Sequence, residues 1–182
     1  NLDATDPDAL SRALPQLVDQ VWACAAFLRR RVPGFENAVF SGLAPRIGIR
    51  EPRRIMGREV LHREDVLTGR KRDEGIGKGA HELDVHGGGQ AHRREMIRDA
   101  GSYDIPFGCL VPRNVSNLLV AGRMIDADPV AHGAIRVMVN MNQTGEAAGV
   151  ASVLAQRTTG DVRTIDVQSL RNELAAGGSV VI

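Results

Sequence analysis

The chain has 182 residues, of which 43% are hydrophobic and 25% charged, and its formal net charge is +1. This composition is typical of a chain that buries a core, and it excludes general disorder. A net charge near zero gives no global field that would attract nucleic acid or a lipid surface. Only 3% of the residues are aromatic, which disfavours a function based on stacking bases. No stretch approaches the roughly 18 apolar residues of a membrane span.

Residues 1–34 predict a helical segment. Asp6 offers a side-chain cap and Pro7 suits the first helical turn. Pro15 should kink this helix or start a second one, and Pro33-Gly34 should end it. We expect an amphipathic helix that covers a core, because apolar residues recur at helical spacing, namely Leu10, Leu14, Leu17, Val18, Val21, Trp22, Ala25 and Leu28.

Residues 35–112 predict mainly strands. Alternation of apolar and polar residues indicates strands in three stretches, which are 38–61, Glu82–His86 and Tyr103–Val111. His62–Gly69 predicts one or two helical turns, and the highly charged stretch Gln90–Gly101 predicts a mobile loop.

The most informative stretch runs from Asn117 to Gly149. The apolar run Leu118–Ala121 predicts a strand buried on both faces, and Gly122 permits close backbone approach at its end. A helix from Ala134 to about Gln156 should follow and pack on that strand, since it is rich in small residues, namely Gly145, Ala147, Ala148, Gly149, Ala151 and Ser152. A strand that feeds the amino end of a helix is where α/β folds bind nucleotides. A last helix is expected from about Val167 to Ala175.

The block NLLVAGR…AHGAIRVM…GEAAG within this stretch resembles the C-terminal cofactor segment of FAD-dependent oxidoreductases of the two-dinucleotide-fold type. Three other blocks resemble the same family in the same order, beginning at Gly42, Tyr103 and Ile165. The resemblance implies an α/β fold. Residues 35–112 would form an α+β substrate domain, 113–160 the last strand and helix of a Rossmann-like FAD domain, and 161–182 a helical tail.

The resemblance also implies a cofactor site. Gly122 and Arg123 would lie near the ribityl-phosphate part of FAD, with Arg123 pairing with the pyrophosphate, and the flavin ring would lie near His132–Val137. The loop Ile125–Gly133 should lead into a helix amino end, whose N–H groups stabilise the charge that reduction creates at the flavin N1–C2=O edge. The cofactor contacts expected are Gly122, Arg123, Ile125, Gly133, Arg136, Val137 and Met138.

Four residues are candidates for catalytic roles. Arg136 would add a fixed positive charge near the flavin, while His132 either transfers a proton or only makes structural hydrogen bonds. Arg46 and Arg50 belong to a cluster between Arg46 and Arg72, where nine Lys or Arg residues meet four acidic residues. An arginine row suits a carboxylate substrate, but structural ion pairs or a solvated edge remain open.

Other reactive side chains predict no separate site. Cys109 lies in an apolar run and should pack inertly, and with Cys24 far away there is no C-x-x-C pair. The loop histidines, which are His81, His86 and His92, lack a Cys partner or an H-E-x-x-H helix, so we expect no metal. Tyr103 either packs with a hydroxyl partner or projects toward substrate. Unpaired cysteines indicate a reducing, cytoplasmic compartment.

The motif that such a flavoenzyme needs at its start is absent. No G-x-G-x-x-G occurs in the chain, and the run Gly87–Gly89 is typical of a loop tip. We therefore expect the C-terminal part, or a subunit, of an oxidoreductase that transfers a hydride or electron pair between a small organic substrate and flavin. An N-terminal FAD-binding portion or partner would complete it. The alternatives are a non-catalytic subunit that has lost the cofactor, and an anion-binding module that uses Arg46–Arg72.

Overall fold

The computed structural model describes residues 2–85 and 92–181, which form two compact units, Asn1–Pro52 and Arg53–Ile182. His86 and Gly87–Gly89 lie outside the described residues. Each unit is considered by itself below. The division into a substrate domain and an FAD domain remains a prediction.

The first unit consists of helix α1 (Pro7–Arg31) and a tail without regular structure. The predicted helix start is confirmed, because Asp6 is the N-cap and its carboxylate accepts from the Asp8 N–H at 2.9 Å. Pro15 lies inside α1, so no second helix begins there. A helix of 25 residues tolerates the single hydrogen bond that this proline removes.

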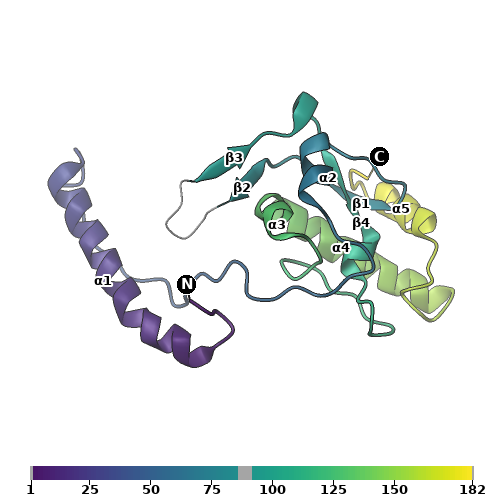
Figure 1. Cartoon of the computed structure of the whole chain (residues 1–182), viewed down its shortest axis with the longest axis horizontal. Coiled ribbons are helices and arrows are strands. Elements are labelled where there is room, and N and C mark those ends of the chain that lie inside the picture. Colours follow the sequence, from purple (N-terminus) through teal and green to yellow (C-terminus); the bar gives the residue numbers. More distant parts are fainter. Residues whose placement is uncertain (1, 86–91, 182) are drawn as a thin grey trace. The chain divides into compact units, whose positions relative to one another are not determined.

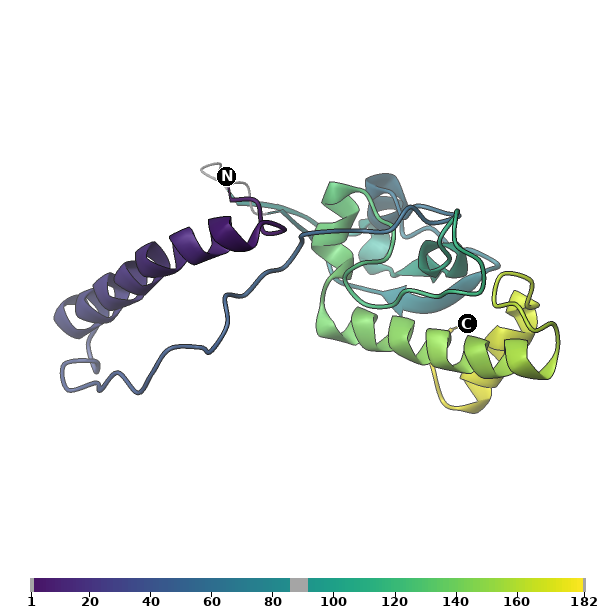
Figure 2. The same cartoon turned by 90° about the horizontal axis from the view of Figure 1, so that it is seen from below.

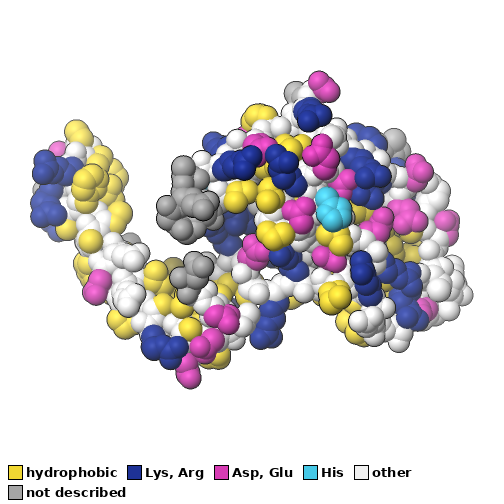
Figure 3. Space-filling view, viewed as in Figure 1, with side chains coloured by type: hydrophobic (Ala, Val, Ile, Leu, Met, Phe, Trp, Pro, Cys, Tyr) yellow, Lys and Arg dark blue, Asp and Glu magenta, His cyan; other side chains and the backbone are white. Residues whose placement is uncertain are grey.

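Within its own unit, α1 covers no core. No residue of α1 is buried, and Leu14, Trp22 and Phe27 are about half exposed. Within its unit α1 has only the tail to pack against, where the ring of Phe40 lies 4.6 Å from that of Trp22. Apolar side chains are accordingly visible on the surface of this unit (Figure 3).

The second unit is a mixture of helices and small antiparallel sheets, which confirms the α/β class (Figure 1). Its elements, in chain order, are α2 (Arg63–Thr68), β1 (Gly75–Gly79), β2 (Leu83–Val85), β3 (Arg93–Glu95), the 3₁₀ helix η1 (Arg98–Ala100), β4 (Tyr103–Pro106), the 3₁₀ helix η2 (Phe107–Leu110), α3 (Pro129–Ile135), α4 (Met138–Arg157) and α5 (Val167–Ala176). Strand β1 pairs with β4, and β2 pairs with β3. The predicted helices at 62–69 and from Val167 are confirmed, as is the strand before residue 86.

Several predicted strands are wrong. The stretch 38–61 forms only isolated bridges, of which one joins Gly57 to Pro112 and another Leu61 to Ala127. The strand expected over Tyr103–Val111 stops at Pro106, which has no N–H to continue a ladder, and a 3₁₀ helix follows. The charged stretch near residue 94 is not simply a loop, because β3 pairs with β2.

The sequence pattern does not predict β1, because glycine is unfavourable in strands. Its glycines are explained by what lies against them. A Cβ on Gly77 would lie 2.7 Å from the Gln143 side chain, and one on Gly79 would overlap the Tyr103 ring. Gly75 to Ala80 also fits the pattern G-x-G-x-x-A, yet it lies in a strand rather than at a strand-to-helix turn. These glycines therefore serve packing and not a phosphate.

Two predictions at the family-like block need correction. Leu118–Ala121 is not a strand: its only backbone hydrogen bond among the described residues runs from the Val120 N–H to the Leu110 carbonyl, at 2.9 Å. A strand requires a neighbouring strand, and none is present there in the described part of the chain. The single helix expected from Ala134 is instead two, α3 and α4, which are separated at Arg136 and Val137.

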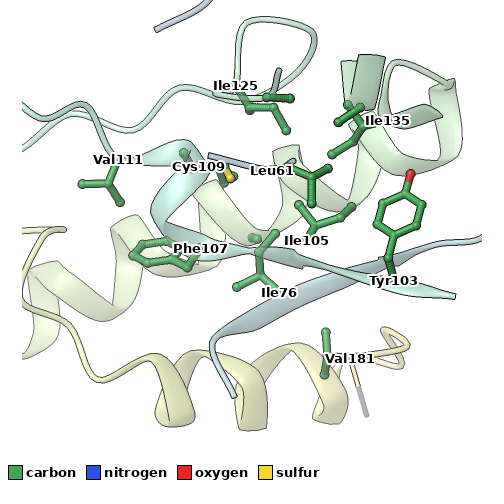
Figure 4. Close-up of a cluster of buried hydrophobic side chains, with 14 of the residues drawn as sticks. Leu61, Ile76, Tyr103, Ile105, Phe107, Cys109, Val111, Ile125, Ile135 and Val181 are labelled. Carbon is green, nitrogen blue, oxygen red and sulfur yellow. The ribbon is translucent and has the colours of Figure 1, made fainter. Parts of the chain in front are cut away.

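The core joins these elements into one body. Buried side chains from β1, β4, η2 and the helices form a continuous cluster (Figure 4). Helix α4 runs beside the β1–β4 pair and contacts α5 (Figure 2). Cys109 is fully buried in this cluster, and burial raises the pKa of its thiol, so the prediction of inert packing is confirmed.

We expect Gly133→Ala to destabilise the chain. Helix α3 packs on β2 so closely that a Cβ on Gly133 would lie 2.6 Å from the Asp84 carbonyl oxygen. Overpacking of this kind costs about 1–3 kcal/mol, and denaturant unfolding would measure it.

The matched control is Gly145→Ala on α4, where a Cβ would meet nothing within 4 Å. It should stabilise the chain by about 0.5–1 kcal/mol through helix propensity. Equal effects of the two substitutions would contradict the close α3–β2 packing.

Candidate functional site

Helices α3 and α4 follow the turn at Gly122, and only one of their amino ends is open. Helix α3 begins after Asp128, whose Oδ1 accepts from the Val130 and Ala131 N–H groups, both at 2.8 Å. That end is closed by its own carboxylate. The expectation that the loop Ile125–Gly133 leads into an open helix end is therefore wrong, because the cap residue sits within that loop.

The amino end of α4 is open. The first N–H groups of any helix have no partner within the helix. The N-cap of α4, Val137, has no side-chain acceptor, so its side chain does not cap them. The next two residues, Met138 and Val139, are 82% and 69% exposed. An uncapped helix end with apolar side chains at its rim suits a flat, partly apolar group whose edge carries negative charge.

Buried polar contacts hold this end in place. Asn140, in the first turn of α4, donates its amide to the Ala134 carbonyl and to the Tyr103 hydroxyl, both at 3.3 Å. One turn later, Thr144 accepts from the Gly122 N–H at 3.0 Å. The Tyr103 hydroxyl points toward the helices (Figure 4), so of the two roles open for this tyrosine the packing role is the one observed.

His132 and Arg136 contact different segments. His132 is fully buried, and its Nε2–H donates to the Arg123 carbonyl at 3.0 Å. The Arg136 guanidinium donates to the Asp84 carbonyl at 3.2 Å and lies 3.9 Å from the Asp84 carboxylate. Both side chains thus fasten α3 to its neighbours.

The other residues expected to contact the cofactor differ in their exposure to solvent. Arg123 and Met138 are exposed, and the residues that precede them in the chain, Gly122 and Val137, are half-buried. Gly122 has φ of +84°, and a Cβ there would meet nothing within 4 Å. Ile125 and Gly133 are buried in the core. The surface available to a ligand is therefore formed by the first group.

The arginine cluster is divided between the two units. Arg46 and Arg50 belong to the first unit, where both are exposed. In the second unit, Arg63, Arg70 and Arg72 make ion pairs with acidic residues. Positive and negative side chains are interspersed over the face of this unit shown in Figure 3. Structural ion pairing is thus observed for the second half of the cluster.

Asp65 is the centre of this pairing. It is 3% exposed, and its carboxylate lies 2.9 Å from Arg72 and 3.1 Å from Arg70. Burial alone would raise the pKa of Asp65, but the His62 N–H and the two guanidinium groups outweigh it and hold the pKa below its ordinary value.

A groove beside α4 is not predicted from the sequence. It has a volume of about 690 Å³ and is lined by Asn117–Leu119 on one side and by Ala148, Gly149, Ser152 and Gln156 on the other. Leu118 is 43% exposed in it. The small residues of α4 are the sequence signal, since they create the hollow. The groove lies between α4 and the 117–119 stretch.

Other kinds of site are not found in the described ranges 2–85 and 92–181. No group of three potential ligands there could hold a metal ion. No helix among those residues is long and apolar enough to cross a membrane.

Comparison with protein families identifies the chain. The family model described as FAD dependent oxidoreductase matches residues 1–174. The chain belongs to the FAD-dependent oxidoreductase family. Its cofactor is accordingly FAD, and its role lies in oxidoreduction. Comparisons with curated proteins and with solved structures gave no match.

The residues around the α4 amino end fit part of FAD. The open N–H groups suit the electron-rich edge of the flavin, and the exposed Met138 side chain offers apolar contact for a ring. The backbone at Gly122 leaves room for close approach. In this family member, the chain thus offers an open helix end whose chemistry suits the flavin.

We expect Asp65→Asn to destabilise the chain by about 3 kcal/mol at neutral pH, because Arg72 would lose its buried counter-charge. The depressed pKa means that the ionised carboxylate contributes stability above about pH 4, and that this contribution is lost as the pH falls through the folded-state pKa. The difference from the native sequence should therefore shrink as the pH falls below the ordinary pKa of about 4. Denaturant unfolding across this pH range measures it.

Glu64→Gln is the control for Asp65→Asn. Glu64 is the exposed neighbour of Asp65 in the first turn of α2, so its neutralisation should cost less than about 0.5 kcal/mol at any pH. A pH-independent loss for Asp65→Asn would contradict the charge pairing.

Proposed function

We propose that this chain is the C-terminal part, or a subunit, of an FAD-dependent oxidoreductase that passes a hydride or an electron pair between a small organic substrate and flavin. The observation that carries the proposal is the open amino end of α4, which Thr144 ties to the Gly122–Arg123 turn in a chain of this family.

The chain contributes binding and charge, while the bound flavin supplies the redox chemistry. The free N–H groups of the first α4 turn and the helix dipole favour negative charge. When they face the flavin N1–C2=O edge, they stabilise the reduced form without any change in protonation of the protein. The buried contacts of Asn140 and Thr144 keep these groups oriented before reduction occurs.

We infer that His132 and Arg136 hold the segments around the site in place and do not contact the substrate. His132 has no exposed surface, and its Nε2–H donates a hydrogen bond to the Arg123 carbonyl. It therefore orients the Gly122–Arg123 turn and does not exchange protons with a substrate. Arg136 is held on β2 beside the Asp84 carboxylate, which offsets its charge. The main electrostatic contribution to the flavin then comes from the α4 backbone.

The substrate proposed is small and carries a carboxylate. Arg46 and Arg50 are exposed and available to bind it, and a guanidinium binds a carboxylate with two parallel hydrogen bonds. The family resemblance assigns their segment to the substrate side of the protein.

An N-terminal FAD-binding portion, or a partner subunit, would complete the site. The groove beside α4 and the exposed Leu118 support this, because 118–121 has the composition of a buried strand and lacks a neighbouring strand in the described part of the chain. We also propose a reducing, cytoplasmic location. Cys24 is a free, exposed thiol, and such thiols persist where cysteines are kept reduced.

We expect this chain by itself to lose FAD during gel filtration, whereas the complete protein should elute yellow. The described residues offer the flavin a helix end but no glycine turn at the start of a helix for the pyrophosphate. The ratio of flavin absorbance to protein absorbance measures the result. Stoichiometric FAD on the isolated chain would contradict the need for a second portion.

We expect Met138→Glu to lower the flavin midpoint potential in the complete FAD-bound protein. A carboxylate at the first position of α4 would oppose the negative charge of the reduced flavin. About 1 kcal/mol of lost stabilisation corresponds to roughly 20 mV for a two-electron couple. Spectroelectrochemical titration measures the shift.

Met138→Gln is the neutral control and should leave the potential unchanged. Met138→Glu should also stabilise the fold by about 0.3–1 kcal/mol, since acidic residues favour helix amino ends. A lower potential in a more stable protein separates the electrostatic role from structural damage. An unchanged potential in the Glu variant would mean that the flavin does not face this helix end.

The competing function is a non-catalytic subunit of the same family that has lost the cofactor. A complete protein that purifies without FAD and cannot be loaded with it would favour that alternative. An anion-binding module has less support, because Arg63, Arg70 and Arg72 are already paired with carboxylates.

A further inference from the structure

Strand β1 has an unusual partner on the edge that faces α4. The backbone of Lys78 makes two hydrogen bonds to one side chain, that of Gln143 on α4: the Lys78 N–H donates to Oε1 at 2.7 Å, and Nε2 donates to the Lys78 carbonyl at 3.0 Å. The carboxamide thus pairs with Lys78 as the peptide group of a neighbouring strand would.

The residues around this contact are shaped for it. Gly77 precedes Lys78, and a Cβ on Gly77 would lie 2.7 Å from the Gln143 Oε1 and 3.1 Å from its Cβ. The strand therefore has no side chain where the glutamine approaches. The other backbone neighbours of β1 lie on β4, where Lys78 is opposite Asp104.

Gln143 is close to the open end of α4 and shares a helix face with the side chains that anchor it. Asn140, Gln143 and Thr144 have the spacing i, i+3 and i+4, and they bind three separate segments: the end of α3 with β4, strand β1, and the Gly122 turn. Strands β1 and β4 both lie in the part of the chain assigned to the substrate side. Asn140 reaches β4 only through the Tyr103 hydroxyl, whereas Gln143 binds the backbone of β1.

We propose that Gln143 is a positioning residue that sets the amino-terminal turn of α4 against β1, and thereby sets the flavin-facing helix end against the substrate side. This inference rests on the proposed function. Both halves of the carboxamide are required, since the nitrogen donates to a carbonyl and the oxygen accepts from an N–H.

The test is Gln143→Glu, because the protonated acid copies the amide and the ionised form does not. A carboxylate cannot donate to the Lys78 carbonyl, so this contact raises the pKa of the introduced carboxyl. The charged groups nearby are Lys78 and Asp104 on the β1–β4 pair, whose side chains lie 3.7 Å apart, and Glu146 on α4 itself. A raised folded-state pKa gives stability that is present at low pH and lost as the pH rises through that pKa.

We expect the unfolding constant of Gln143→Glu to exceed that of the native sequence about tenfold at pH values near 7.5, and less than about threefold near pH 4.5. In the complete FAD-bound protein, the flavin midpoint potential of Gln143→Glu should fall below that of the native sequence near pH 7.5, where the introduced carboxyl is ionised. A threefold change in the ratio of reduced to oxidised flavin corresponds to roughly 14 mV. The control is Gln168→Glu, the same change at an exposed position of α5, which should show neither effect.

The outcomes are distinguishable. If Gln143→Glu loses stability with the expected pH dependence while the flavin potential follows the native protein, Gln143 is only structural and the proposal is overturned. If Met138→Glu shifts the potential and Gln143→Glu does not, the flavin position stands and the role of Gln143 is wrong. If neither substitution shifts it, the proposed flavin position is wrong as well. Gln143→Met, which removes both hydrogen bonds, should lower the potential at every pH.

Discussion

The close approach of α4 to β1 is the constraint on which the second unit depends. Glycines at alternate positions of β1 remove side chains from the strand, so that Tyr103 and Gln143 can occupy the space. Because interiors are packed at near-crystalline density, a helix at this distance has little freedom to slide or rotate. The direction of α4 then fixes where its amino end points and where α5 can pack.

A second constraint comes from buried charge. Arg72 lies between Asp65 and Glu59, and its own N–H donates to the Asp104 carboxylate at 3.0 Å. This network ties α2 to the loop before β1 and to β4. A buried ion pair is weak evidence for net stability, but removal of one partner is costly, so the network defines one arrangement of these segments.

These constraints fix the position of the open amino end of α4. An uncapped helix end on a mobile element would reorganise whenever charge developed nearby. Here Asn140, Gln143 and Thr144 bind the first two turns to three separate segments. Preorganised donors of this kind stabilise charge without a reorganisation cost, which suits a site where electrons arrive at a bound cofactor.

The sequence was sufficient for features that depend on local chemistry. Asp6 and Pro7 specify the start of α1, the 62–69 stretch specifies α2, and Cys109 in an apolar run specifies a buried thiol. The ordered blocks specify the family, which the match over residues 1–174 confirms. Each of these follows from neighbours in the chain, or from motifs read directly from residue order.

The tertiary structure decided what depends on distant partners. Leu118–Ala121 has the composition of a strand but forms none, because strand structure requires hydrogen bonds from a second segment. Glycine-rich β1 is a strand against its propensity, because β4 and Gln143 supply those bonds. The break between α3 and α4 carries no proline or glycine signal. It is held by the Asn140 amide on the Ala134 carbonyl, a contact that only the folded chain brings together.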